Sequence, residues 1–171
     1  DLDGSSHWNA ALNGGDNKSD VDDLGFIDAL INKLSSENLI DLKRVYAVGY
    51  SNGGMMSYAL ACYKSNLIAA IGSVSGYMLQ STSSVSESEC TPTHSIPLIK
   101  FHGTTDYYDG DGVYNSVESV INFWVNFNNT NTDPNTNNID DNGTSITSYK
   151  YENGDNNVSV EHYKIIGGEH V

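Results

Sequence analysis

The 171-residue chain contains the segment Gly49-Tyr50-Ser51-Asn52-Gly53, a Gly-x-Ser-x-Gly motif. Residues 45–48 before it are apolar and β-prone, and residues 54–62 after it are compatible with a helix. A strand, a sharp turn and a helix form the setting in which this motif presents a reactive serine. We expect both glycines to be there because a Cβ would clash where strand and helix converge. Ser51 is therefore predicted to be a nucleophile; the alternative is an ordinary Gly-Ser loop.

The composition excludes some partners. The chain carries 8 Lys and Arg against 22 Asp and Glu, a net charge of -14. Nucleic acid and anionic membranes attract basic faces, so neither is an expected partner. No apolar run approaches the roughly 18–20 residues of a membrane span. The chain begins at Asp1, which is compatible with a removed leader peptide.

The two cysteines, Cys62 and Cys90, leave two alternatives open. They form a disulfide, as in many secreted proteins, or they are two buried free thiols. No pair of Cys and His has the spacing of a zinc site, so we expect no metal.

The hydrophobic pattern predicts one α/β domain over residues 1–171, with a mostly parallel sheet and helices on both faces. An amphipathic helix is expected at 20–35, capped by Ser19 or Asp20. Other helices are expected at 53–63 and 116–127, and strands at 45–48, 68–74, 97–101 and 158–166. Residues 77–95 form a Ser/Thr-rich excursion, and residues 128–147 are expected to be an irregular loop.

Residues 133–144 resemble the start of a calcium-binding loop, but the pattern is incomplete. The sixth position holds Asn138 instead of Gly, and the twelfth holds Thr144 instead of Glu. We expect a solvated loop there.

Three residues at the carboxyl ends of predicted strands suggest a catalytic triad: Ser51, Asp106 and His170. A serine hydroxyl needs a base to take its proton, and the base needs a carboxylate to orient it. The order Ser, Asp, His is that of the α/β-hydrolase fold. His170 follows the last strand through a Gly-Gly turn.

The other candidates fit less well. His7 and His94 break the order, His162 lies within a strand, and His102 is expected to make a structural hydrogen bond. Asp109 and Asp111 are alternatives to Asp106, and the acidic stretch 106–111 could instead hold a cation or simply be solvated.

The oxyanion of an acyl-transfer intermediate needs two N–H donors. The backbone of Asn52 is expected to supply one. No His-Gly-Gly loop precedes Ser51 to supply the second.

The chain resembles the secreted esterases that include polyhydroxybutyrate depolymerase-like, feruloyl and acetylxylan esterases. The resemblance rests on blocks distributed along nearly the whole chain: Trp8-Asn9, Asn13-Gly14-Gly15-Asp16, Val21-Asp22-Asp23-Leu24-Gly25-Phe26, Arg44-Val45-Tyr46, Gly49-Tyr50-Ser51-Asn52-Gly53-Gly54-Met55-Met56, His102-Gly103-Thr104-Thr105-Asp106 and Gly167-Gly168-Glu169-His170.

This resemblance implies an α/β-hydrolase fold, a secreted (extracellular or periplasmic) location, and ester cleavage through an acyl-enzyme without metal or cofactor. Ser51 would be the nucleophile, His170 the general base and acid, and Asp106 its orienting carboxylate. We expect Trp8 and Tyr50 to contact the substrate, with a core anchor as the alternative for Trp8. Because such esterases carry strands before residue 1 and continue past Val171, the chain is expected to be an internal part of a longer enzyme.

Three alternatives remain to the serine esterase: a lipase, a serine peptidase of the same fold, and a non-catalytic carbohydrate-binding module. The polar segment 77–95 is unlike the apolar lid of a lipase, and no cap domain of a peptidase is visible. The ordered triad argues against a binding module.

Overall fold

The computed structural model describes residues 6–12, 19–80, 84–107 and 114–170. Asp109 and Asp111, the alternative triad acids, lie outside the described residues, as does most of the acidic stretch 106–111.

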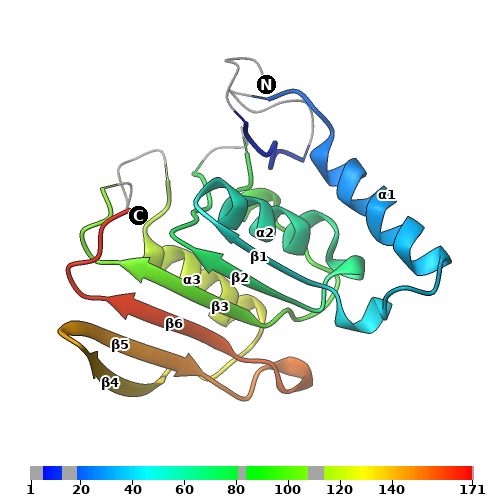
Figure 1. The fold of residues 1–171 in the computed structure, drawn as a ribbon. Coiled ribbons are helices and arrows are strands. Elements are labelled where there is room, and N and C mark those ends of the chain that lie inside the picture. Colours follow the sequence, from blue (N-terminus) through cyan, green and yellow to red (C-terminus); the bar gives the residue numbers. More distant parts are fainter. Residues whose placement is uncertain (1–5, 13–18, 81–83, 108–113, 171) are drawn as a thin grey trace.

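A six-stranded sheet in the order β1-β2-β3-β6-β5-β4 forms the centre of the fold (Figure 1). Its four parallel strands are β1 (Tyr46–Tyr50), β2 (Ala70–Val74), β3 (Leu98–Gly103) and β6 (Val160–Ile165). They match the four strands expected from the sequence. Because they run in one direction, their carboxyl ends meet at one edge, where the candidate triad lies.

The prediction of an irregular loop at residues 128–147 is wrong, because most of this segment belongs to a β-hairpin. Strands β4 (Asn135–Asp141) and β5 (Thr144–Tyr151) pair antiparallel, and β5 pairs antiparallel with β6. The turn is Asn142-Gly143, with φ of 51° and 87°. Asn-Gly is the strongest short hairpin signal. Every residue of β4 is exposed, so this strand lacks the alternating apolar pattern that reveals a half-buried strand.

In the described part of the chain three α-helices accompany the sheet: α1 (Asp23–Ser36), α2 (Asn52–Tyr63) and α3 (Val117–Phe127). Helix α1 begins later than expected, because Asp22 is its cap and accepts a hydrogen bond from the Gly25 backbone N–H at 2.8 Å. Short 3₁₀ helices lie at Leu42–Arg44, Ser65–Leu67, Glu87–Glu89 and Asp155–Asn157. None of the described helices is long and apolar enough to cross a membrane.

Helices α2 and α3 pack on the same face of the sheet (Figure 1). The buried rings of Tyr58 from α2 and Trp124 from α3 stack at 6.2 Å between centroids. Helix α1 lies beside edge strand β1 (Figure 1). On edge strand β1, Tyr46 and Val48 remain 61% and 74% exposed.

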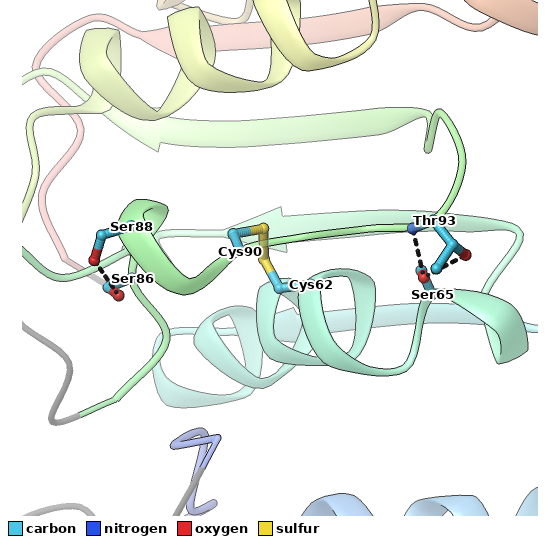
Figure 2. The surroundings of a disulfide bond; sticks show 6 residues. All are labelled: Cys62, Ser65, Ser86, Ser88, Cys90 and Thr93. Atoms are coloured by element: carbon cyan, nitrogen blue, oxygen red, sulfur yellow. Dashed lines mark hydrogen bonds between the residues drawn. A yellow bond between two sulfur atoms is a disulfide. The ribbon is translucent and has the colours of Figure 1, made fainter.

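A disulfide joins Cys62 near the end of α2 to Cys90 in the 77–95 excursion (Figure 2). The two Cα atoms lie 4.5 Å apart. One turn further along, Ser65 Oγ accepts a hydrogen bond from the Thr93 backbone N–H at 3.0 Å. The excursion is thus fastened at two points, to the end of α2 and to the 3₁₀ helix Ser65–Leu67 that follows it, although its composition resembles that of a free loop.

Candidate active site

Ser51 occupies a strained turn between β1 and α2, with φ of 51° and ψ of -118°. Its backbone N–H donates to the Val74 carbonyl at 2.8 Å, and its carbonyl accepts from the Met55 N–H at 3.0 Å. These bonds attach the turn to β2 and to the first turn of α2. A non-glycine residue at positive φ is costly and persists only where its surroundings enforce it. The turn therefore has the form that presents a reactive serine.

Of the two motif glycines, only Gly49 is sterically required. A Cβ on Gly49 would lie 2.2 Å from backbone atoms of Gly53, whereas a Cβ on Gly53 would meet no atom within 4 Å. Our expectation of a clash at Gly53 is therefore wrong. The second crowded position is Gly54, where a Cβ would lie 2.8 Å from Ser73 Oγ and 3.0 Å from Gly76 Cα.

The structure brings Ser51, His170 and Asp106 into one hydrogen-bonded chain. Ser51 Oγ lies 2.8 Å from His170 Nε2, and His170 Nδ1 lies 2.8 Å from Asp106 Oδ2. With the proton of neutral His170 on Nδ1, that nitrogen donates to the carboxylate and Nε2 accepts from the serine hydroxyl. This arrangement can remove the serine proton during attack on a carbonyl carbon.

The loop that carries His170 is held against the loop that carries Asp106. Thr104 Oγ1 accepts from the Gly167 N–H at 2.8 Å, and the N–H and hydroxyl of Thr105 donate to the Gly168 carbonyl at 2.9 and 2.8 Å. A Cβ on Gly103 would lie 2.1 Å from that same carbonyl oxygen. The pairs His102-Gly103 and Gly167-Gly168 thus lie in contact, and this contact fixes the distance between Asp106 and His170.

The side chains of Asp106 and His170 are largely shielded from water. The Asp106 side chain is 0% exposed and that of His170 is 12% exposed. A carboxylate shielded from water stabilises an adjacent imidazolium more strongly than one in solvent. The adjacent carboxylate would therefore favour an imidazolium at His170, against the cost of burying the ring.

Asn52 has two roles in the geometry. It is the first residue of α2, where backbone N–H groups have no partner within the helix. Its side chain also docks the N-terminal segment, since Oδ1 accepts from the Trp8 N–H at 2.7 Å and Nδ2 donates to the Trp8 carbonyl at 3.0 Å. Sequence reasoning included only the backbone of Asn52.

Three aromatic residues lie around Ser51 and His170. Trp8 is 40% exposed, Tyr50 47% and Tyr107 68%. The ring centroids of Tyr50 and Tyr107 are 5.5 and 6.0 Å from that of His170. Trp8 and Tyr50 also line a cavity of about 530 Å³ beside β1. Trp8 is thus not enclosed as a core anchor would be, and Tyr107, directly after Asp106, is a neighbour that sequence reasoning missed.

The other four histidines do not occupy the position beside Ser51 Oγ that His170 holds. His7 Nε2 is 3.4 Å from Asn52 Nδ2, and His94 Nε2 is 2.9 Å from the Ser65 carbonyl oxygen. His102 and His162 are buried. Burial is the main cause that lowers the pKa of His102 to about 3 and that of His162 to about 4, and the nearby Lys100 charge adds to both. Within the described residues, no group of three or more His, Cys, Asp or Glu side chains is placed to hold a metal ion.

Two known proteins that are similar in sequence to this chain are esterases. Feruloyl esterase B of Piromyces equi is 33% identical over 88 residues, which are 52% of this chain and 16% of that protein. Feruloyl esterase D of Neurospora crassa is 30% identical over 95 residues, 56% of this chain and 30% of that protein. The matched region is therefore less than a third of either relative.

A solved structure confirms the fold. Acetyl xylan esterase from Aspergillus awamori superposes with a TM-score of 0.57 over 85% of this chain and 61% of that one. Since the sequences are only 14% identical, this likeness concerns the α/β-hydrolase fold alone. Residues 16–139 match the sequence profile of the phospholipase/carboxylesterase family, and this match spans more than half of the chain. The chain belongs to the phospholipase/carboxylesterase family.

Proposed function

We propose that residues 1–171 belong to one α/β-hydrolase catalytic domain and that this domain is a serine carboxylesterase. The observation that carries the proposal is the chain of contacts from Ser51 Oγ through His170 to Asp106, each 2.8 Å long. Membership of a carboxylesterase family supports it.

In the proposed reaction, Ser51 Oγ attacks the ester carbonyl carbon while His170 Nε2 takes the hydroxyl proton. The buried carboxylate of Asp106 stabilises the imidazolium that forms. The backbone N–H of Asn52 donates to the developing oxyanion. His170 then returns the proton to the leaving alcohol, which departs and leaves an acyl group on Ser51. A water molecule, activated by His170, releases the acid and restores the serine.

The proposed substrates are feruloyl or acetyl esters of plant polysaccharides, with oligomers of polyhydroxyalkanoate polyesters as the alternative. The names of the relatives favour the first class. The exposed rings of Trp8, Tyr50 and Tyr107 support substrate contact, because an aromatic rim stacks on planar acyl groups or on sugar faces. Comparing kcat/KM for methyl ferulate, acetylated xylan and hydroxybutyrate oligomers discriminates among them. A preference for the polyester would overturn the first choice.

We also propose that the protein is secreted, to the extracellular space or the periplasm. The disulfide between Cys62 and Cys90 supports this, because such bonds persist in oxidising compartments.

Burst kinetics with p-nitrophenyl acetate test the mechanism. We expect a burst of nitrophenol equal to the enzyme concentration, and its loss in Ser51→Ala together with a fall in kcat/KM of about 10³-fold or more. Ser57→Ala is the matched control, because this serine lies in the next turn of α2 and donates to the Gly53 carbonyl at 3.0 Å. A Ser51→Ala protein that retains turnover would refute the proposal.

A further inference from the structure

A buried polar layer lies beneath the candidate triad. Tyr77, Lys100 and His102 are 3%, 0% and 2% exposed. His102 Nε2 lies 2.8 Å from the Tyr77 hydroxyl and 3.2 Å from Asp106 Oδ2, the same oxygen that His170 Nδ1 contacts at 2.8 Å. Two imidazole rings therefore converge on a single carboxylate oxygen, one from the His170 loop and one from the end of β3.

The surroundings of His102 select one tautomer. Its Nδ1 is buried without a hydrogen-bond partner, while its Nε2 faces two oxygens. A proton on Nδ1 would leave a buried donor unsatisfied and would direct the Nε2 lone pair at the carboxylate of Asp106. A proton on Nε2 is directed at the Tyr77 hydroxyl, 2.8 Å away, beside Asp106 Oδ2 at 3.2 Å, and it leaves Nδ1 as an unpaired acceptor instead of an unpaired donor.

The same layer keeps His102 neutral. Lys100 Nζ donates to the Gly76 carbonyl at 2.6 Å and lies 5.6 and 5.7 Å from the ring centroids of Tyr58 and Tyr77. Burial first, and then this cation, hold the pKa of His102 at about 3, although Asp106 opposes the shift. At neutral pH the ring therefore offers the carboxylate one N–H and no net charge.

We propose that His102 is a positioning residue whose Nε2–H, held by the Tyr77 hydroxyl at 2.8 Å, is shared with Asp106 Oδ2 at 3.2 Å and so fixes the carboxylate against His170. This role rests on the proposed function, since it acts through Asp106 and His170. A second donor holds the buried carboxylate in its ionised, correctly oriented form. The donor also offsets part of the negative charge of Asp106 and so lowers the proton affinity of the Asp106–His170 pair.

Nitrogen-15 NMR of the whole chain tests the tautomer independently of activity. We expect the His102 signals to show a proton on Nε2 and to remain unchanged between pH 5 and 8. A signal typical of the Nδ1–H tautomer, or a ring that titrates in this range, would overturn the proposal even if the protein proves to be an active esterase.

Kinetics of His102 variants test the consequence. His102→Phe keeps a ring of similar size but removes the donor, and we expect kcat to fall about tenfold with KM within twofold. The acid limb of the kcat/KM profile should move up by about one pH unit, because the remaining pair binds a proton more readily. His102→Gln places an amide N–H near the same position and should restore the limb. The other titratable and charged groups stay in place in both variants: Tyr50 and Tyr107 beside the His170 ring, and Tyr77, Lys100 and His162 around position 102.

His162→Phe is the matched control. His162 is buried on β6, is 5% exposed, and has its own pKa lowered to about 4, so its removal disturbs the same core without changing a contact of Asp106. A merely structural role for His102 would lower the melting temperature of His102→Phe and leave the acid limb at the wild-type pH, which would refute the proposal. If His102→Phe does not fold, the NMR measurement of the His102 tautomer and the kinetics of His102→Gln test the proposal. A Ser51→Ala protein that stays active would refute the esterase proposal, and this result is distinct from any outcome of the His102 experiments.

Discussion

The Ser51 turn depends on a close approach between two glycine backbones. The Gly49 Cα lies so near Gly53 that a methyl group at 49 would overlap backbone atoms at 2.2 Å, and backbone atoms cannot rotate away as a side chain does. The strained φ of Ser51 is held by this approach and by the bond from its N–H to the Val74 carbonyl.

We therefore predict that Gly49→Ala lowers the free energy of unfolding by about 3 kcal/mol and also lowers activity. Gly53→Ala should leave stability unchanged or raise it by up to about 1 kcal/mol, because the site is open and alanine favours a helix. Urea unfolding of the two variants makes the comparison. Equal losses in both would contradict the steric explanation.

Residue types and local order were sufficient to nominate the triad. Glycine at 49, serine at 51 and the order Ser, Asp, His all have local reasons that can be identified in the sequence. Lys100 is a further signal in the sequence: a lysine within the otherwise apolar segment 97–101 indicates a buried polar partner, and its side chain is fully buried.

At the scale of elements, hydrophobic pattern predicts the strands with a buried face but not the exposed hairpin, for which the Asn142-Gly143 pair is the signal in the sequence. Strands β1, β2, β3 and β6 lie under helices or in the centre of the sheet and are apolar or alternating. The pairing of β4 with β5 instead relies on backbone hydrogen bonds and on the Asn142-Gly143 turn, which leave no trace in hydrophobic periodicity. Composition alone favoured a loop there.

The disulfide gives an element-scale prediction for the 77–95 excursion. It closes a loop with a sequence separation of 28, so the double variant Cys62→Ser with Cys90→Ser should lose about 3 to 4 kcal/mol of stability. Thermal unfolding with and without dithiothreitol provides the measurement. Reductant should destabilise the wild type and leave the double variant unchanged. A wild type that is insensitive to full reduction would show that the bond does not hold the excursion to α2.

At the scale of the whole molecule, two buried neutral histidines couple stability to pH. The pKa of His102 is lowered to about 3 and that of His162 to about 4, against 6.5 for an ordinary histidine. Below pH 6.5 the unfolded chain binds protons that the folded chain does not, so stability falls as pH decreases.

We expect each of the two histidines to contribute a slope of up to about 1.4 kcal/mol per pH unit between pH 6.5 and 5, a window above ordinary carboxylate pKa values. Urea unfolding across this window measures the slope, and His162→Phe should reduce it by about half. Stability that stays level or increases as the pH is lowered would contradict the burial of neutral rings.

The chain's sequence was enough to predict the nucleophile turn, the four parallel strands and the order of the candidate triad, because each depends on neighbouring residues or on a repeating apolar pattern. The meeting of the Gly103 and Gly168 backbones, the docking of Trp8 on Asn52 and the placement of His102 against Asp106 join residues between 4 and 65 positions apart. Such contacts depend on how the strands and loops pack in three dimensions. The geometry of the acid and base, and the polar layer that supports them, were therefore decided by the tertiary structure.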